Sequence, residues 1–99
     1  MNEQKLSGML GLAERARPTS AGMDACRLMI RSGKCGVLLL DGESAENTRK
    51  KAENLCRMTG TAMIILPSGL IRKATGKTNM VMAVQKGSFA EQILTINKG

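Results

Sequence analysis

Three short apolar runs constrain the fold of this chain more than any other feature of its sequence. They span residues 36–40, 62–66 and 79–84, and the first two end at Asp41 and Pro67. Short apolar runs without alternation are typical of strands that are covered on both faces. Segments with helical spacing separate the runs. The sequence therefore predicts a three-layer α/β/α sandwich whose central sheet is mixed, partly parallel and about four strands wide.

The order of the runs gives each strand an expected place. We expect residues 36–40 to form a central strand and residues 62–66 to form a second buried strand. Residues 18–20 could add a short strand at the edge. The chain has 99 residues and shows no internal repeat, linker or low-complexity stretch. We therefore expect residues 1–99 to be a single domain with one core.

Apolar residues at spacings of three and four predict helices around the strands. The predicted helices span residues 5–16, 20–32, 44–59, 68–75 and 88–96. Ser44 is expected to cap the third of them, and Ser88 with Glu91 fits a capping box that opens the last. Gly33, Gly60 and Gly76 are expected to end helices.

The second predicted helix, which starts at Ser20 or Gly22, requires an apolar face toward the sheet. Its spacing predicts that Ala25, Leu28, Met29 and Ser32 form this face.

Net charge points to the class of partner. The chain carries 15 Lys and Arg against eight Asp and Glu, a net charge of +7. Such a density attracts polyanions, so nucleic acid is the leading partner class, with a merely well-solvated basic surface as the alternative. Phe89 is the one aromatic residue in the sequence. Because single-strand binders usually stack bases on aromatic rings, structured RNA fits better than extended strands, and DNA stays open.

The composition argues against catalysis and metal binding. The sequence has no His, which removes the most common general base and metal ligand. Cys26, Cys35 and Cys56 have no zinc-type spacing, so we expect reduced cysteines that pack in the core, no metal and no cofactor. The sequence starts without a secretory signal pattern and has no membrane-length apolar run, which predicts a cytoplasmic protein without a membrane partner.

Two windows of the sequence concentrate the positive charge. Residues 15–34 hold five basic residues and one acidic residue, Asp24, and residues 54–90 hold no carboxylate. The first window includes the predicted start of a helix near Gly22, where free backbone amides favour a phosphate or a base edge. The second includes the loop at residues 76–79. If the sheet brings these two segments together, one end of the domain offers a basic, amide-rich site.

Four passages of the sequence have the order and spacing of a known family. They are Leu10-Gly11-Leu12-Ala13-Glu14-Arg15-Ala16, Ile30-Arg31-Ser32-Gly33-Lys34, Ser44-Ala45-Glu46-Asn47-Thr48-Arg49-Lys50-Lys51, and Ala74-Thr75-Gly76-Lys77 before Val81-Met82-Ala83-Val84. Over nearly its whole length the chain resembles the ribosomal-protein family of kink-turn RNA binders, the L-seven-Ae and L-thirty-e superfamily, and most closely its small bacterial members of the YlxQ type. The resemblance implies a three-layer fold, no enzymatic activity, and binding of ribosomal or other kink-turn RNA where the second helix begins.

The family's Gly-x-Asn-Glu-x-x-Lys motif falls on residues 22–28, and the match is partial. Gly22 matches, Asp24 stands in the Asn place, Ala25 in the Glu place and Leu28 in the Lys place. Ionised Asp24 only accepts hydrogen bonds and Ala25 makes none, so two polar contacts to bases are lost or altered. Arg27 is adjacent to the vacant Lys place and could supply a cation.

The expected function is that of a non-catalytic, ribosomal-protein-like RNA-binding protein that recognises structured, kink-turn-like RNA as a monomer without a cofactor. The expected RNA-binding residues come from both basic windows: Gly22, Met23, Asp24, Arg27, Arg31, Lys73, Gly76, Lys77, Thr78 and Asn79. One alternative is a protein-interaction or scaffold domain that keeps the fold without kink-turn specificity and exposes an apolar patch near Met23 and Met80. Another is a small enzyme that binds a phosphorylated ligand at the amides of the second helix.

Overall fold

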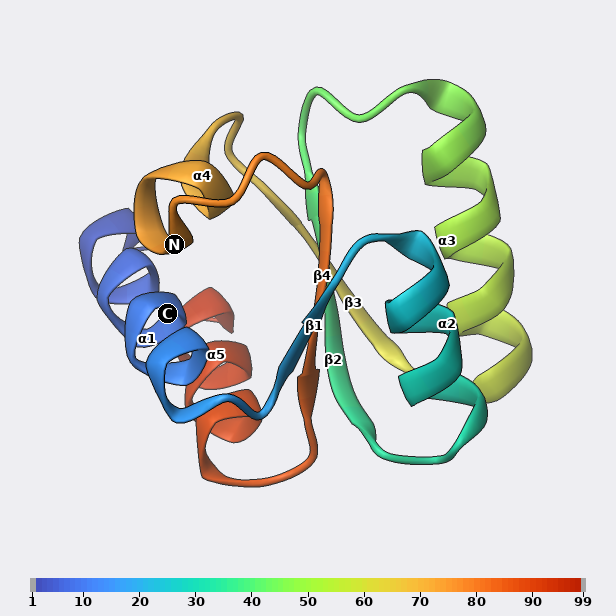
Figure 1. Cartoon of the computed structure of the whole chain (residues 1–99), viewed down its shortest axis with the longest axis horizontal. Coiled ribbons are helices and arrows are strands. Elements are labelled where there is room, and N and C mark those ends of the chain that lie inside the picture. Colours follow the sequence, from blue (N-terminus) through green and yellow to red (C-terminus); the bar gives the residue numbers. More distant parts are fainter. Residues whose placement is uncertain (1, 99) are drawn as a thin grey trace.

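The computed structural model describes residues 2–98 and consists of a four-stranded sheet between two layers of helices (Figure 1). The elements are α1 (Glu3–Ala16), β1 (Thr19–Ala21), α2 (Met23–Arg31), β2 (Cys35–Asp41), α3 (Glu46–Thr59), β3 (Ala62–Leu66), α4 (Leu70–Thr75), β4 (Val81–Gln85) and α5 (Ser88–Lys98). The strand order is β1-β4-β2-β3, with β2 and β3 parallel and β4 antiparallel to both of its neighbours. The predicted α/β/α sandwich with a mixed four-stranded sheet is confirmed.

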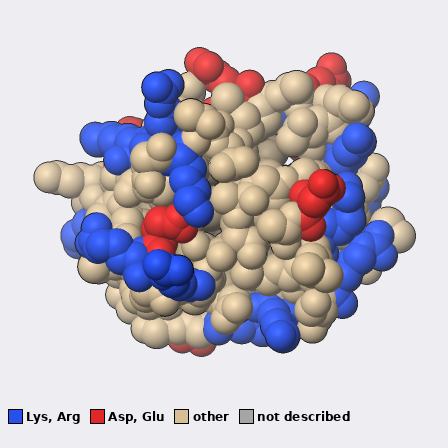
Figure 2. Space-filling view, viewed as in Figure 1, with Lys and Arg blue, Asp and Glu red and all other residues tan. Residues whose placement is uncertain are grey.

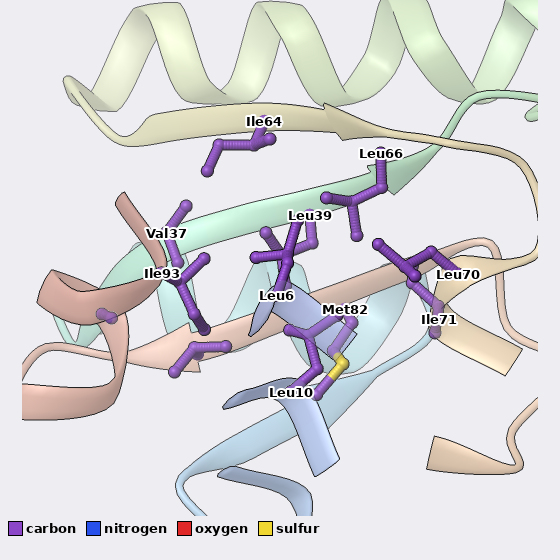
Figure 3. Packing of buried hydrophobic residues seen from close by; sticks show 12 residues of the cluster. Leu6, Leu10, Val37, Leu39, Ile64, Leu66, Leu70, Ile71, Met82 and Ile93 are labelled. Atoms are coloured by element: carbon purple, nitrogen blue, oxygen red, sulfur yellow. The ribbon is translucent and has the colours of Figure 1, made fainter. Parts of the chain in front are cut away.

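The position of β2 between two layers of helices explains why the sequence of this strand is apolar without interruption. Successive side chains of a strand point to opposite faces. Val37 and Leu39 pack in the cluster formed with α1, α4 and α5, whereas Leu38 and Leu40 pack in the cluster formed with α2 and α3. Figure 3 shows the first of these clusters, in which Leu6 and other helix residues meet β2 and β4. Both faces of β2 are therefore core, as predicted.

The three cysteines are free and buried, in agreement with their predicted packing role. Burial raises the pKa of the Cys26 thiol to about 12 and that of the Cys56 thiol to about 11. Desolvation disfavours the charged thiolate, so these side chains stay neutral at physiological pH.

Strand β3 is an edge strand, and the prediction that it is buried on both faces is wrong. Ile64 and Leu66 pack in the cluster with α1, α4 and α5, but Ile65 between them is exposed. The face of the strand toward α3 is only partly covered, since Met63 packs against the cluster under α2 and α3 while Ile65 stays exposed. The apolar run at residues 62–66 therefore forms a strand that is covered fully on one face only.

Two predicted caps are also wrong. The Ser44 hydroxyl donates to the carbonyl of Asp41 at 2.6 Å, and Ala45 occupies the N-cap of α3 without a side-chain hydrogen bond. Ser88 already lies in α5, where its hydroxyl accepts a hydrogen bond from the Gln92 side chain. In both cases a nearby polar partner competes with the expected capping bond. Gly33, Gly60 and Gly76 do adopt positive φ at helix ends, as predicted.

The buried face of α2 is rotated from the predicted one. Cys26, Met29 and Ile30 are buried, whereas Ala25 and Ser32 are exposed and Leu28 is 69% exposed. The Cys26 thiol donates to the carbonyl of Ser20, which turns this side chain toward β1. Since each residue advances about 100° around a helix, Leu28, two residues after the buried Cys26, points away from the face formed by Cys26, Met29 and Ile30.

Candidate nucleic-acid interface

The start of α2 and the loop between α4 and β4 lie against each other. The Gly22 amide donates to the carbonyl of Val81 at 3.0 Å, and a side chain at Gly22 would stand 3.4 Å from Nδ2 of Asn79. The antiparallel pairing of β1 with β4 produces this arrangement, because the chain leaves β1 where it enters β4. The two segments that the sequence could not place relative to each other therefore share one end of the sheet.

Gly22 has a conformation that other residues rarely adopt. Its φ of 89° and ψ of 151° fall in a region that is populated almost entirely by glycine. Asp24 and Arg27 follow in the first turns of α2, with Oδ1 of Asp24 3.4 Å from Nη1 of Arg27. Both lie near the free amides of the helix start, so an anion approaching these amides meets one cation and one carboxylate.

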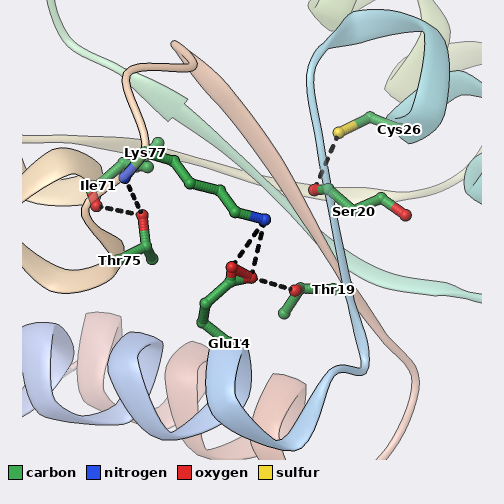
Figure 4. A network of polar contacts seen from close by, with 7 residues as sticks. All are labelled: Glu14, Thr19, Ser20, Cys26, Ile71, Thr75 and Lys77. Carbon is green, nitrogen blue, oxygen red and sulfur yellow. Dashed lines mark hydrogen bonds and ion pairs between the residues drawn. The ribbon is translucent and has the colours of Figure 1, made fainter.

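The loop at residues 76–79 divides its side chains between two directions. Gly76 ends α4 with φ 77°, and Thr78 and Asn79 are exposed and line a hollow together with Asp41 at the end of β2. Lys77 turns the other way, where its Nζ lies 2.8 Å from Oε2 of Glu14 on α1 (Figure 4). This loop therefore links the candidate end of the sheet to helix α1.

A basic hollow surrounds the Lys77–Glu14 ion pair. It measures about 860 Å³ and is lined by Glu14, Arg15, Arg17, Thr19 and Lys77. The Thr19 hydroxyl donates to Oε1 of Glu14 at 2.8 Å. The hydrogen bond from Lys77 lowers the pKa of the Glu14 carboxyl, which is only 18% exposed, so the carboxylate stays charged. The hollow thus holds three cations and one carboxylate, and of the three cations Lys77 is the one paired with Glu14.

Sequence reasoning missed Arg15, Arg17 and Thr19 as neighbours of Lys77. Arg15 and Arg17 lie in the first basic window, which was the available signal, but the expected site used only its helical part. Their position beside Lys77 depends on a contact between residues 14 and 77, which are 63 positions apart. We call residues 15, 17 and 77 the basic hollow cations.

Two of the expected site residues lie away from the Gly22–Asn79 contact. Arg31 is the last residue of α2, about 12 Å along the helix axis from its first residue. Lys73 belongs to α4, which covers the opposite face of the sheet from α2 (Figure 1). The contact itself therefore brings together Gly22, Asn79 and their immediate neighbours, with Arg31 and Lys73 on the periphery.

A second, smaller hollow lies on the other side of the loop. It measures about 280 Å³, and its lining includes Arg72, Thr78, Asn79 and Met80. Asp41 supports this end of the sheet: its buried carboxylate accepts from the amides of Glu43 at 2.8 Å and Gly69 at 2.9 Å. These bonds hold the β2–α3 and β3–α4 turns in place beside the loop.

The apolar patch expected near Met23 and Met80 is only partly present. Met80 is exposed, but Met23 packs against the core cluster under α2 and α3. Leu28 supplies exposed apolar surface on α2 that was not expected there.

Basic side chains flank the end of the sheet where the start of α2 meets the loop between α4 and β4. Figure 2 shows them on the side of α1 and on the side of α2 and α3, with acidic groups beside them on both sides and a largely uncharged surface between. Within residues 2–98, no cluster of three or more His, Cys, Asp or Glu is arranged to hold a metal ion. None of the helices in this described range is both long and apolar enough to span a membrane. The arrangement suits a polyanion held by backbone amides and separate cations.

Known proteins are similar to this chain in sequence and in structure. No family model matches the chain. The chain is 29% identical over 90 residues to the RNA-binding protein YlxQ of Bacillus subtilis (strain 168), covering 89% of this chain and 90% of that protein. Its fold is similar to that of a protein of unknown function from Bacillus halodurans C, with a TM-score of 0.90, 22% identity and coverage of 96% and 98% of the two chains. It is also similar to the Giardia lamblia 15.5kD RNA binding protein, with a TM-score of 0.74, 9% identity and coverage of 94% and 81%.

Proposed function

We propose that this chain is a non-catalytic RNA-binding protein of the kink-turn-binding ribosomal-protein family, acting as a single-domain monomer. The observation that carries the proposal is the contact of Gly22 with Asn79 and Val81, which joins the start of α2 to the loop before β4. The similarity to a protein named for RNA binding, over nine-tenths of both chains, supports the partner class.

The proposed site offers the three kinds of contact that structured RNA requires. Gly22 and the amides that follow it allow the RNA backbone to approach closely, because no side chain stands in the way. The exposed Asn79 amide can donate to and accept from a base edge. Arg27 and the basic hollow cations lie on either side, where they would hold phosphates. A base released from stacking would fit the hollow beside Thr78 and Asn79.

The partial motif match defines how this chain would recognise a kink-turn. Leu28, which stands where the family motif has Lys, is 69% exposed, so this position faces solvent with an uncharged side chain. Arg27, one residue earlier, is the nearest cation on α2 and is paired with Asp24. We therefore propose that Arg27 and Asn79, rather than residues 25 and 28, carry the preference for bent RNA.

A second candidate function rests on the same exposed Leu28. Apolar surface on a helix next to a basic site is typical of a protein contact, which fits a scaffold domain that has lost kink-turn specificity. In this case Leu28→Ser would leave RNA binding unchanged and weaken a protein complex instead.

The experiment that tests the proposed site is an NMR titration of the isotope-labelled chain with a kink-turn RNA. We expect the largest amide shift changes at residues 22–27 and 76–79, with smaller ones at residues 15–19. Changes confined to Lys98 and the outer face of α3 would contradict the proposal, because they would indicate diffuse attraction to a basic surface.

A further inference from the structure

A shallow apolar groove runs between α1 and α5, on the layer of helices that lies across the sheet from α2 (Figure 1). The groove measures about 620 Å³ and is lined by Lys5, Gly8, Met9, Leu12, Arg15, Gln92 and Ile96. Leu12 is 47% exposed, and Met9 and Ile96 are partly buried against the core. Large apolar side chains thus remain in contact with solvent along the seam of two helices.

Gly8 at the floor of this groove has no role in the fold. A Cβ at Gly8 would meet no atom within 4 Å, and φ at this position is not positive. Glycine inside a helix is less stable than alanine, because it orders a more flexible backbone. Gly11 is different, since a Cβ there would stand 3.2 Å from the carbonyl oxygen of Ala74 on α4. Gly11 is explained by helix packing, whereas Gly8 leaves bare backbone open to a molecule from outside.

The charges around the groove specify the chemistry of that molecule. Lys5 and Arg15 line it, and neither forms an ion pair with any residue in the range 2–98. They lie ten residues apart on α1, which corresponds to about 15 Å along the helix axis. The lining of the groove contains no carboxylate. A molecule that complements this groove is therefore apolar in the middle and acidic toward both ends.

The geometry points to a docking site for an acidic amphipathic helix of a partner protein. Apolar residues at i, i+3, i+4 and i+7 of that helix would cover Leu12 and Ile96, and its backbone would pass close to Gly8. Carboxylates about ten residues apart would reach Lys5 and Arg15. A second copy of this chain fits less well, since the net charge of +7 makes two copies repel. The site is separate from the Gly22–Asn79 contact and shares with the basic hollow only Arg15, so RNA and the partner would compete for that one cation.

The test uses the full chain and a synthetic acidic peptide. The peptide carries leucines at i, i+3, i+4 and i+7 and glutamates about ten residues apart, and its matched control has lysine in place of each glutamate. We expect saturable binding of the acidic peptide, with amide shift changes along residues 5–15 and 92–96. The lysine peptide should bind at least about tenfold more weakly, a difference of about 1.4 kcal/mol.

Two variants locate the binding. Gly8→Gln fills the groove floor with a better helix former, so it should raise the melting temperature and yet weaken peptide binding at least about tenfold. Met58→Gln changes a side chain that is 83% exposed outside the groove, and it should leave peptide binding unchanged. No saturable binding, or equal binding of both peptides, would each overturn this inference. Because RNA binding is measured separately, these outcomes leave the proposed RNA site unaffected.

Discussion

The two ion pairs near the candidate RNA site differ in what they hold together. Asp24 and Arg27 are three residues apart on α2, their charged atoms are 3.4 Å apart, and the Asp24 side chain is fully exposed. Glu14 and Lys77 are 63 residues apart, their closest charged atoms are 2.8 Å apart, and Thr19 also donates to the carboxylate. An exposed pair within one helix contributes little to stability, whereas the second pair ties α1, β1 and the α4–β4 loop together. We therefore expect the Glu14–Lys77 pair to hold the loop in position in addition to any binding role, and the Asp24–Arg27 pair to affect binding alone.

The largest expected effect comes from Gly22, where the two regions join. Gly22→Ala places a Cβ 3.4 Å from Asn79 in a conformation that is strained for alanine. We expect the free energy of unfolding to fall by about 1–3 kcal/mol, measured by urea denaturation. RNA affinity should fall at least about tenfold in a fluorescence anisotropy titration.

Gly33→Ala is the matched control for that variant. Gly33 also has a positive φ of 72°, but a Cβ there would meet no atom within 4 Å. Its stability should fall in the same way while RNA affinity stays unchanged. Equal losses of RNA affinity in both variants would show that Gly22 acts through folding alone.

Charge reversal should separate site cations from the rest of the basic surface. Arg27→Glu and Lys77→Glu are each expected to weaken RNA binding by about tenfold, because each replaces an attraction to phosphate with a repulsion. Lys98→Glu, at the end of α5, should have a smaller effect. Three equal losses would indicate diffuse electrostatic attraction and would remove the argument for a defined site.

Removal of each carboxylate tests the difference between the two pairs directly. Glu14→Gln should lower the free energy of unfolding by roughly 0.5–1 kcal/mol, because the side chain is mostly covered and loses its pairing with Lys77. Asp24→Asn should cost less stability, because Asp24 lies fully exposed in the first turn of α2, and strengthen RNA binding, since a carboxylate leaves the start of this helix. A larger stability loss for Asp24→Asn than for Glu14→Gln would reverse the comparison.

The pH dependence of Glu14 is the smallest expected effect. Lys77 holds the pKa of this carboxyl below its ordinary value, so the pairing contributes stability above the ordinary Glu pKa. That contribution should disappear as the pH falls through the lowered pKa. Denaturation curves of the native chain and Glu14→Gln should therefore differ at neutral pH and converge in acid. A difference that grows in acid would contradict the assigned pairing.

The layers of the fold could be predicted from the sequence because they depend on local patterns. The apolar runs at residues 36–40 and 62–66 are strands, and both lie in the one mixed sheet. The edge position of β3 could not be predicted, since its run is as apolar as that of β2. The outward position of Leu28 could not be predicted either, because Cys26, Met29 and Ile30 form an alternative apolar face at the same helical spacing, and packing against the sheet selects it.

The site was predictable in its parts but not in its assembly. Gly22 and the loop at residues 76–79 stand out by charge and glycine content, yet their contact follows from the pairing of β1 with β4. The direction of Lys77 toward Glu14 depends on a tertiary contact that no local spacing encodes. The exposed carboxylate and cation at Asp24 and Arg27, by contrast, follow from their spacing on one helix.

The most direct test of this account is a binding titration against a kink-turn RNA and an equal-length control whose G·A pairs are changed to Watson–Crick pairs. The titration is made at a low and a high salt concentration, because each phosphate contact contributes a log–log slope of roughly −0.7 to −0.9. The account predicts tighter binding of the kink-turn at both salt concentrations, with affinity for both RNAs falling as salt rises. Equal affinity for the two RNAs, lost together at high salt, would contradict it.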